Sequence, residues 1–246
     1  MPHTRLYVRA KLAPGSEISM GEDQTRYLGR VLRLQVGDTL SVFNGEGSEF
    51  AATIANIAKD SSLLSIGERI ETNMESPLKL HLVQGVSRGE RMDFVVQKAT
   101  ELGVKRVSPV LTKHGGVKLS ADRAAKRRDH WQKIAESACE QSGRTRPPLI
   151  DMPMPLKIWL ESRTQDHDID LILRPNAQAS LASIPAPATK ICLLIGPEGG
   201  FSGGEYDAAE ITGCKAVTFG PRILRTETAA VAAIAVVQSM WGDMRA

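Results

Sequence analysis

From Leu78 onwards the sequence alternates short apolar segments with segments of helical periodicity. The apolar segments cover residues 80–83, 104–111, 149–152, 171–173, 191–195 and 216–219. The helical patterns between and after them cover residues 90–102, 120–142, 156–163, 204–212 and 226–241. Because strands that alternate with helices are joined by crossovers, this order predicts an α/β fold with a mainly parallel sheet.

The first 72 residues have a different rhythm. Two segments with strand-like alternation flank the turn sequence at 44–47, which predicts a β-hairpin. A further strand is expected at 63–66 and a short helix at 23–32. The polar segment 71–77 is typical of a linker. We therefore expect two domains, a small β-rich one over residues 1–72 and an α/β one over residues 73–246.

Composition excludes several classes of protein. A hydrophobic share of 42% supplies a full core and argues against disorder. The three cysteines are widely spaced and give no disulfide framework, and the five histidines show no metal-ligand spacing, so no metal is expected. The longest apolar run, at 229–237, is too short to span a bilayer, and no signal peptide is evident. A cytoplasmic protein without membrane attachment is the expectation.

The net charge of +3 is unevenly distributed. Residues 73–150 hold 15 Lys and Arg against 8 Asp and Glu, whereas the flanking segments are slightly acidic. This concentration favours a polyanionic partner, and solvated helix faces are the alternative explanation. Several of the arginines stand in glycine-containing loops, where a guanidinium suits phosphate binding.

Two glycine- and proline-rich junctions follow predicted strands. Residues 194–202 read LIGPEGGFS, and residues 219–228 read FGPRILRTET. Glycine permits positive φ and close approach of a ligand to the main chain. Ligands of parallel sheets bind beyond the carboxyl ends of the strands, so the two junctions predict one ligand site. Neither a G-x-G-x-x-G nor a Walker A pattern is present, which argues against an ordinary nicotinamide or P-loop site.

The segment 200–204 also matches the G-x-S-x-G pattern of a hydrolase nucleophile. A Ser–acid–His order is impossible here because the last histidine, His167, precedes Ser202. We interpret Ser202 instead as a helix N-cap, with Glu205 completing a capping box.

The last helical segment is apolar on nearly every side between Thr228 and Val237. Such a helix must be covered all round, which one domain rarely achieves at a chain end. We therefore predict a homodimer that buries this helix at the subunit interface.

Several segments together resemble the RsmE family of SPOUT methyltransferases. These segments are 27–33 (YLGRVLR), 87–94 (SRGERMDF), 97–104 (QKATELGV), 116–118 (GVK), 131–135 (WQKIA), 138–144 (ACEQSGR), 194–202 and 219–229. The segment 171–175 departs slightly, with Arg174 where histidine is common before proline. The family methylates N3 of a uridine in 16S ribosomal RNA with S-adenosylmethionine.

The resemblance implies a PUA-like RNA-binding β-barrel over residues 1–72 and a SPOUT domain with a deep trefoil knot over residues 73–246. It also implies a homodimer that acts on 16S ribosomal RNA, within the assembled small subunit. The alternatives are an RNA methyltransferase for another nucleotide or a ribose hydroxyl, and a non-catalytic RNA-binding assembly factor.

Site residues are carried over by position in the matching segments. Cofactor binding is implied for Leu173, Pro175, Gly196, Pro197, Glu198, Gly199, Gly200, Phe219, Gly220, Ile223, Leu224, Arg225 and Glu227. Main-chain groups of Gly199, Gly200, Ile223 and Leu224 are expected to contact the adenosine. RNA binding is expected for Arg30, Arg33, Arg88, Lys98, Lys118, Arg144 and Arg222.

Catalytic roles are expected for Glu198, Arg225 and Glu227. Either carboxylate could accept the uracil N3 proton, and helix N-terminal capping is the alternative role for both. Arg225, with Arg88 and Arg144, could stabilise a developing uracil anion or hold phosphate.

Overall fold

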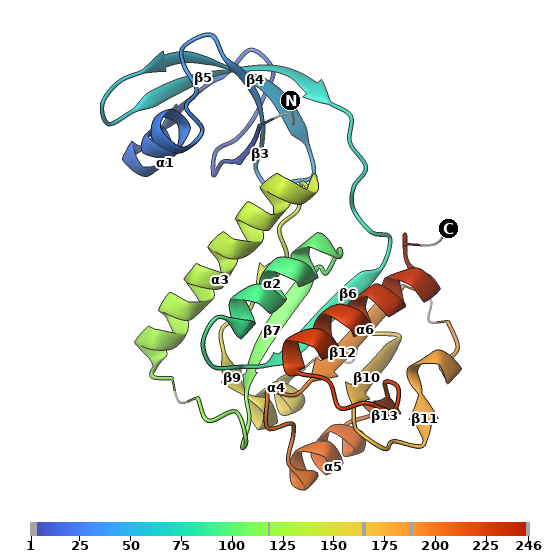
Figure 1. The fold of residues 1–246 in the computed structure, drawn as a ribbon. Coiled ribbons are helices and arrows are strands. Elements are labelled where there is room, and N and C mark those ends of the chain that lie inside the picture. The colour runs from blue at the N-terminus through green and yellow to red at the C-terminus, as the bar shows by residue number, and fades with distance from the viewer. Residues whose placement is uncertain (1–3, 118, 164–165, 187–188, 245–246) are drawn as a thin grey trace. The chain divides into compact units, whose positions relative to one another are not determined.

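The structure is a computed structural model that describes residues 4–117, 119–163, 166–186 and 189–244 (Figure 1). The chain divides into two compact units, Met1–Glu75 with Cys139–Arg146, and Ser76–Ala138 with Pro147–Ala246. The sequence-based division had left residues 139–146 in the second domain. They group with the first unit because the Arg5 guanidinium donates to the carbonyls of Cys139 at 2.5 Å and Arg144 at 3.0 Å.

The first unit is built on a five-stranded sheet with the order β1-β3-β4-β5-β2. Its strands are β1 (Arg5–Tyr7), β2 (Glu17–Met20), β3 (Thr39–Phe43), β4 (Glu49–Ile57) and β5 (Ser62–Ile70). The predicted hairpin is confirmed, since β3 and β4 pair antiparallel with Val42 opposite Phe50. The predicted helix is present in two parts, α1 (Glu22–Arg26) and a π-helical turn η1 (Tyr27–Val31). Leu28, Leu40 and Leu64 are fully buried in its core.

The second unit contains an eight-stranded sheet in which every strand pair is parallel. The order is β11-β13-β10-β12-β6-β7-β8, and β9 also pairs with β7. The strands are β6 (Lys79–Gly85), β7 (Arg106–Leu111), β8 (Leu149–Ile150), β9 (Met154–Pro155), β10 (Ile169–Leu173), β11 (Ala179–Ser180), β12 (Lys190–Ile195) and β13 (Lys215–Thr218). The α/β prediction with a parallel sheet is therefore confirmed.

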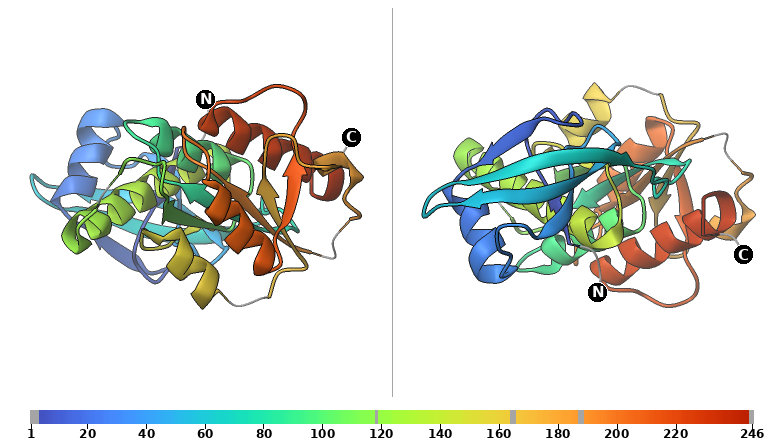
Figure 2. Two further views of the ribbon diagram at one scale, coloured as in Figure 1. Left: turned by 90° about the horizontal axis from the view of Figure 1, so that it is seen from below. Right: turned by 90° about the horizontal axis from the view of Figure 1, so that it is seen from above.

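Helices cover both faces of this sheet. They are α2 (Arg91–Glu101), α3 (Ala121–Ser142), α4 (Leu156–Ser162), the 3₁₀ turn η2 (Leu181–Ser183), α5 (Gly203–Ile211) and α6 (Thr226–Trp241). One core joins the strands to α2, α3 and α6, and a second joins them to α4 and α5. Figure 2 shows α6 and α4 on opposite sides of the sheet. Alternate side chains of one strand serve the two cores, as Leu193 and Leu194 of β12 do.

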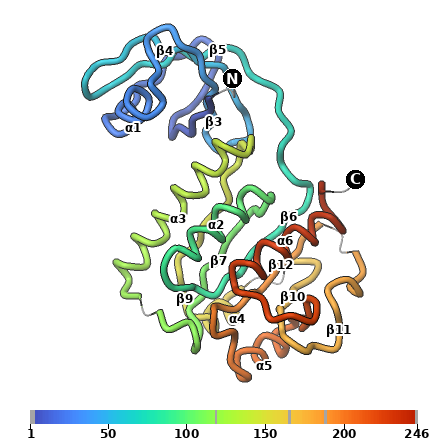
Figure 3. The backbone as a smooth tube through the Cα atoms, viewed as in Figure 1, coloured from blue at the N-terminus to red at the C-terminus, as the bar shows by residue number. Residues whose placement is uncertain are grey.

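Strands β10, β12 and β13 lie next to one another in the sheet, so the segments that follow them leave from the same edge (Figure 3). Over the described residues, no helix combines the length and apolarity needed to cross a membrane. All three cysteines are buried and free.

Candidate active site

A cavity of about 430 Å³ opens at the carboxyl edge of the second unit's sheet. Three segments line it, one after each of β10, β12 and β13. Eleven residues of the predicted cofactor set are in its lining: Leu173, Pro175, Gly196, Pro197, Glu198, Gly199, Gly200, Phe219, Gly220, Ile223 and Leu224. Arg225 and Glu227 are not in the lining as the described residues define it. The two glycine-rich junctions thus meet at one hollow.

Hydrogen bonds at the start of α6 fasten two of the lining segments to the sheet. The hydroxyl of Thr226, a buried residue, donates to the carbonyl oxygen of Gly196 at 2.6 Å. The side-chain amide of Gln84, at the end of β6, donates to the Thr226 hydroxyl at 2.9 Å. Gln84 is fully buried, so these bonds form in a low-dielectric environment where they are strong. These hydrogen bonds hold the loop after β12 and the start of α6 in place beside the cavity.

Two glycines, which have no side chain, allow the loop after β12 to pack closely against neighbouring segments. A Cβ atom on Gly85 would stand 2.5 Å from the main-chain nitrogen of Pro197. A Cβ on Gly199 would stand 2.9 Å from the carbonyl oxygen of His114. Both distances are shorter than van der Waals contact, so these two glycines are required by the packing of the loop itself.

The helix that follows this loop begins as predicted. The main-chain N–H of Ser202 donates to Oε2 of Glu205 at 2.7 Å, and the capping box is complete. The other oxygen, Oε1 of Glu205, accepts from the main-chain N–H of Lys113 at 2.8 Å. Ser202 is thus engaged as a helix cap, which agrees with the rejection of a hydrolase nucleophile.

Arg91 brings the two predicted catalytic carboxylates into one cluster. Its Nη1 lies 2.5 Å from Oε1 of Glu198, and its Nε lies 3.9 Å from Oε1 of Glu227. The main-chain N–H of Arg88 also donates to Glu198, at 3.2 Å. The sequence analysis gave Arg91 no role in catalysis. Its partners are more than 100 positions away, and local spacing carries no signal for such a pair.

The two carboxylates differ in their surroundings. Burial alone would raise the pKa of Glu198, but hydrogen bonds from its own main-chain N–H, from Arg91 and from Arg88 outweigh burial and lower that pKa. Glu227 is more enclosed, with 18% of its side chain exposed against 31% for Glu198. Within the described chain, Oε2 of Glu227 is buried and has no hydrogen-bond partner.

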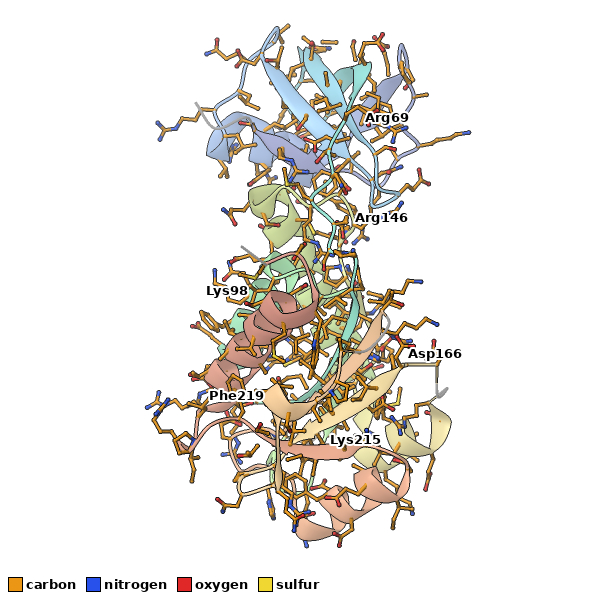
Figure 4. All side chains as sticks on the ribbon, turned by 90° about the vertical axis from the view of Figure 1, so that its right-hand side faces the viewer. Arg69, Lys98, Arg146, Asp166, Lys215 and Phe219 are labelled. Carbon is orange, nitrogen blue, oxygen red and sulfur yellow. The ribbon has the colours of Figure 1, made fainter. Side chains whose placement is uncertain are left out.

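Four of the residues expected to bind RNA are exposed: Arg30, Arg33, Arg88 and Arg222. Arg30 lines a hollow of the first unit together with Arg26 and Lys59. Arg222 lines the cavity of the second unit. Lys98, labelled on α2 in Figure 4, is bound by Glu101 with Nζ 2.7 Å from Oε1.

Arg144 does not occupy the exposed position that the sequence suggested. Its side chain is 2% exposed, and its Nη2 lies 3.0 Å from Oε2 of Glu75. The expectation that its guanidinium binds phosphate is therefore corrected, because burial in an ion pair removes it from solvent. Lys118 lies outside the described residues.

A basic hollow in the second unit was not among the predicted sites. It measures about 530 Å³ and is lined by Gly116, Val117, Leu119, Arg123, Lys126 and Arg127. The three basic side chains project from the first turns of α3. In the sequence this hollow is indicated by the run of basic residues at 123–128, which was counted in the positive charge of residues 73–150 but not assigned to a site.

Comparison with known proteins assigns the family. Residues 74–238 match the RNA methyltransferase domain, and residues 21–67 match the RNA methyltransferase PUA domain. The ribosomal RNA small subunit methyltransferase E of Buchnera aphidicola is 34% identical over 98% of this chain and 95% of its own length. The protein of the same name from Bacillus subtilis is 30% identical over 89% of this chain and 88% of its own.

Solved structures agree with the sequence matches. The ribosomal RNA small subunit methyltransferase E from Neisseria gonorrhoeae, bound to S-adenosyl methionine, superposes with a TM-score of 0.91 and 37% identity over 99% of this chain and 100% of its own. The two matched domains, which cover the α/β unit and part of the β-rich unit, place the chain in the class of RNA methyltransferases. The chain belongs to the family of ribosomal RNA small subunit methyltransferase E.

Proposed function

We propose that the protein transfers a methyl group from S-adenosylmethionine to N3 of a uridine in 16S ribosomal RNA, within the assembled small subunit. The observation that carries this proposal is the cavity at the carboxyl edge, where three loops and the Glu198–Arg91–Glu227 cluster come together. The proposed type of reaction rests on membership of the family. The proposed substrate, small-subunit ribosomal RNA, rests on the names of the relatives described above.

The residues around the cavity fit a nucleoside cofactor. The lining combines apolar side chains, such as Leu173, Phe219 and Leu224, with main-chain groups of glycine-rich loops. Such a mixture suits an adenine ring and a ribose, which need flat apolar contact and a few polar contacts. When bound there, S-adenosylmethionine supplies an activated methyl group on a sulfonium. We assign the adenosine contacts to main-chain groups of Gly199, Gly200, Ile223 and Leu224.

Glu227 is the group that we assign to accept the uracil N3 proton. Its Oε2 is buried and has no hydrogen-bond partner among the described residues. A substrate N–H that donates to this oxygen would remove the energetic cost of leaving a buried acceptor unpaired. Nε of Arg91 lies 3.9 Å from the other oxygen and orients the carboxylate. Glu198 is held by the three donors named above, and we assign it to position Arg91 rather than to act on the substrate.

Arg225 and the exposed arginines are assigned to the RNA. Arg225 is exposed at the N-cap of α6, next to the cavity-lining Thr226, and can stabilise charge that develops on the uracil oxygens. Arg88 and Arg222 lie near the same loops and suit the phosphates that flank the target. Arg30 and Arg33 provide the corresponding positive charge on the first unit.

We further propose that the protein is a cytoplasmic homodimer. In α6, Ala230, Ala233 and Val237 face the core of the unit, whereas Val231, Ala232 and Ala235 lie on the other side of the helix and remain half-buried. A second copy would cover this outward apolar stripe. Light scattering at micromolar concentration is expected to give twice the 26.7 kDa chain mass, and a monomer mass would contradict the dimer.

Calorimetry and methyl transfer together test the proposed function. The protein is expected to bind S-adenosylmethionine and to methylate small subunits from cells that lack it. Cofactor binding without any transfer would favour a different RNA target. No cofactor binding at all would favour a non-catalytic assembly factor.

A further inference from the structure

At the amino edge of the same sheet, three potential metal ligands converge. They are His81 on β6, Cys192 on β12 and His167, which precedes β10. One ligand atom from each lies within 4.8 Å of the others. In Figure 4, Asp166, next to this cluster in sequence, and Phe219, in the cofactor cavity, lie on opposite sides of the second unit. The cluster is therefore separate from the candidate active site.

The parallel strands fix two of these residues side by side. Cys192 is the register partner of His81 between β12 and β6, and Asp170 of β10 is the partner of Cys192. Register partners on adjacent strands point to the same face of a sheet. Cys192 is fully buried and His81 is 6% exposed, while 13% of the His167 side chain reaches solvent and leaves an entry route.

The spacing of the two imidazoles matches a shared ion. Nδ1 of His81 lies 3.3 Å from Nε2 of His167. Zinc–nitrogen bonds of about 2.0–2.1 Å in a tetrahedron place two ligand nitrogens roughly 3.3–3.4 Å apart. The two nitrogens therefore already have the separation that coordination requires.

In each imidazole, the ring nitrogen that faces away from the other histidine lies close to a polar side chain. Nε2 of His81 lies 2.7 Å from the hydroxyl of Ser108, and that hydroxyl donates to Asp151. Because the hydroxyl donates to the carboxylate, it accepts from His81 Nε2–H, and the lone pair of His81 stays on Nδ1. Nδ1 of His167 lies 3.0 Å from Oδ1 of Asp170, within ion-pair distance but without hydrogen-bond geometry between the two atoms. A carboxylate at this position favours one orientation of the ring.

Zinc binding deprotonates the thiol of Cys192, and the proton released from sulfur passes to solvent.

We propose that His81, His167 and Cys192 form a zinc site that braces the amino edge of the sheet. Two imidazole nitrogens and one thiolate are a donor set that zinc favours, with water in the fourth position. The ion links β6, β12 and the segment before β10, and the carboxyl ends of β10 and β12 lead to the candidate active site. Its role is to stabilise the fold rather than to take part in methyl transfer.

Zinc titration of the chelator-treated full-length protein tests this site. We expect one zinc per chain by calorimetry and, at a hundredfold excess over the dissociation constant, a Tm increase of roughly 5–10 °C. His167→Gln is expected to abolish both, whereas the matched control His130→Gln, at an exposed histidine, retains both. Equal zinc binding by the two variants, or none by the unaltered protein, would overturn the proposal.

Cobalt provides a second readout that reports on sulfur. Cobalt loading is expected to give thiolate-to-metal absorption, which Cys192→Ala removes and Cys139→Ala, at a buried cysteine of the first unit, keeps. If Cys192→Ala does not fold, the comparison of His167→Gln with His130→Gln tests the proposal by itself. A metal-free pair of imidazoles that share one proton predicts no cobalt absorption in any variant, and that result also overturns the proposal.

Discussion

The loop after β12 and the start of α6 each place one carboxylate near Arg91. The two carboxylates differ in their hydrogen bonds and in their exposure to solvent. Glu198 accepts hydrogen bonds from Arg91, from the main-chain N–H of Arg88 and from its own main-chain N–H, and it is the more exposed of the two carboxylates. Glu227 is more enclosed, stands farther from the guanidinium and keeps one oxygen without a partner among the described groups. A carboxylate whose charged form is already satisfied is a poor proton acceptor, and one with an open acceptor position is better suited to the task. The difference assigns positioning to Glu198 and proton transfer to Glu227.

The largest effect is expected from Glu227→Gln. Removal of a general base lowers kcat by about 10²–10⁴-fold, and cofactor affinity should remain unchanged because Glu227 is not in the cavity lining. Single-turnover methyl transfer and calorimetry measure the two quantities. Glu161→Gln, at an exposed glutamate of α4, is the matched control and should retain full activity. Unimpaired transfer by Glu227→Gln would reverse the assignment of the two carboxylates.

Gly85→Ala should weaken cofactor binding next most strongly. Its Cβ would displace Pro197, and strain of about 1–3 kcal/mol corresponds to roughly a 5- to 150-fold loss of affinity. Gly203→Ala is the control, because nothing lies within 4 Å of its Cβ position and its φ is not positive. Equal affinities for the two variants would show that the loop position does not depend on Gly85.

These expectations also show which features were accessible from the sequence. The hairpin at Asn44–Gly47, the strand–helix order and the two glycine-rich junctions depend on local pattern, and the structure confirms them. The short strands β1, β2, β9 and β11 were missed because two to four residues show no clear periodicity, whereas the equally short β8 and β13 were predicted from their apolar residues. Cavity-lining residues could be named because they follow directly from the ends of apolar strands.

Features that depend on distant partners could not be predicted. Arg144 looked like a loop arginine available for phosphate, but Glu75, 69 positions away, buries it in an ion pair. His81 and His167 are 86 positions apart, so their convergence follows only from the strand order. In each case the partner is chosen by the register of the sheet or the packing of the unit, which residue spacing does not encode.

A double-mutant cycle on Arg91 and Glu198 sharpens the comparison at a smaller scale. Because both side chains are partly exposed, their coupling in the free energy of unfolding is expected to be about 0.2–1 kcal/mol. Urea unfolding of Arg91→Ala, Glu198→Gln and the double variant provides the measurement. If Glu198 acts through Arg91, both single variants should lower methyl transfer and the double variant should be no worse than Arg91→Ala. Fully additive losses of activity would contradict that order.

The smallest expected effect is on the acid dependence of stability. The folded-state pKa of Glu198 is lowered, so its contribution is fully present above the unfolded-state pKa and is lost as the pH falls through the folded-state value. Given its partial exposure, the contribution should be below about 1 kcal/mol. Urea midpoints between neutral and acidic pH should therefore converge for the unaltered protein and Glu198→Gln as the pH falls. A gap that widens on acidification would show that the pKa is raised instead.

Mass mapping of methylated 16S ribosomal RNA tests the central claim most directly. Small subunits from cells that lack the protein are incubated with the purified protein and S-adenosylmethionine, and the RNA is then digested and mapped. The account predicts one added methyl group, on N3 of a single uridine, and a strongly reduced yield of it with Glu227→Gln over the same incubation. A methyl group on a ribose, on another base, or none with the unaltered protein would contradict it.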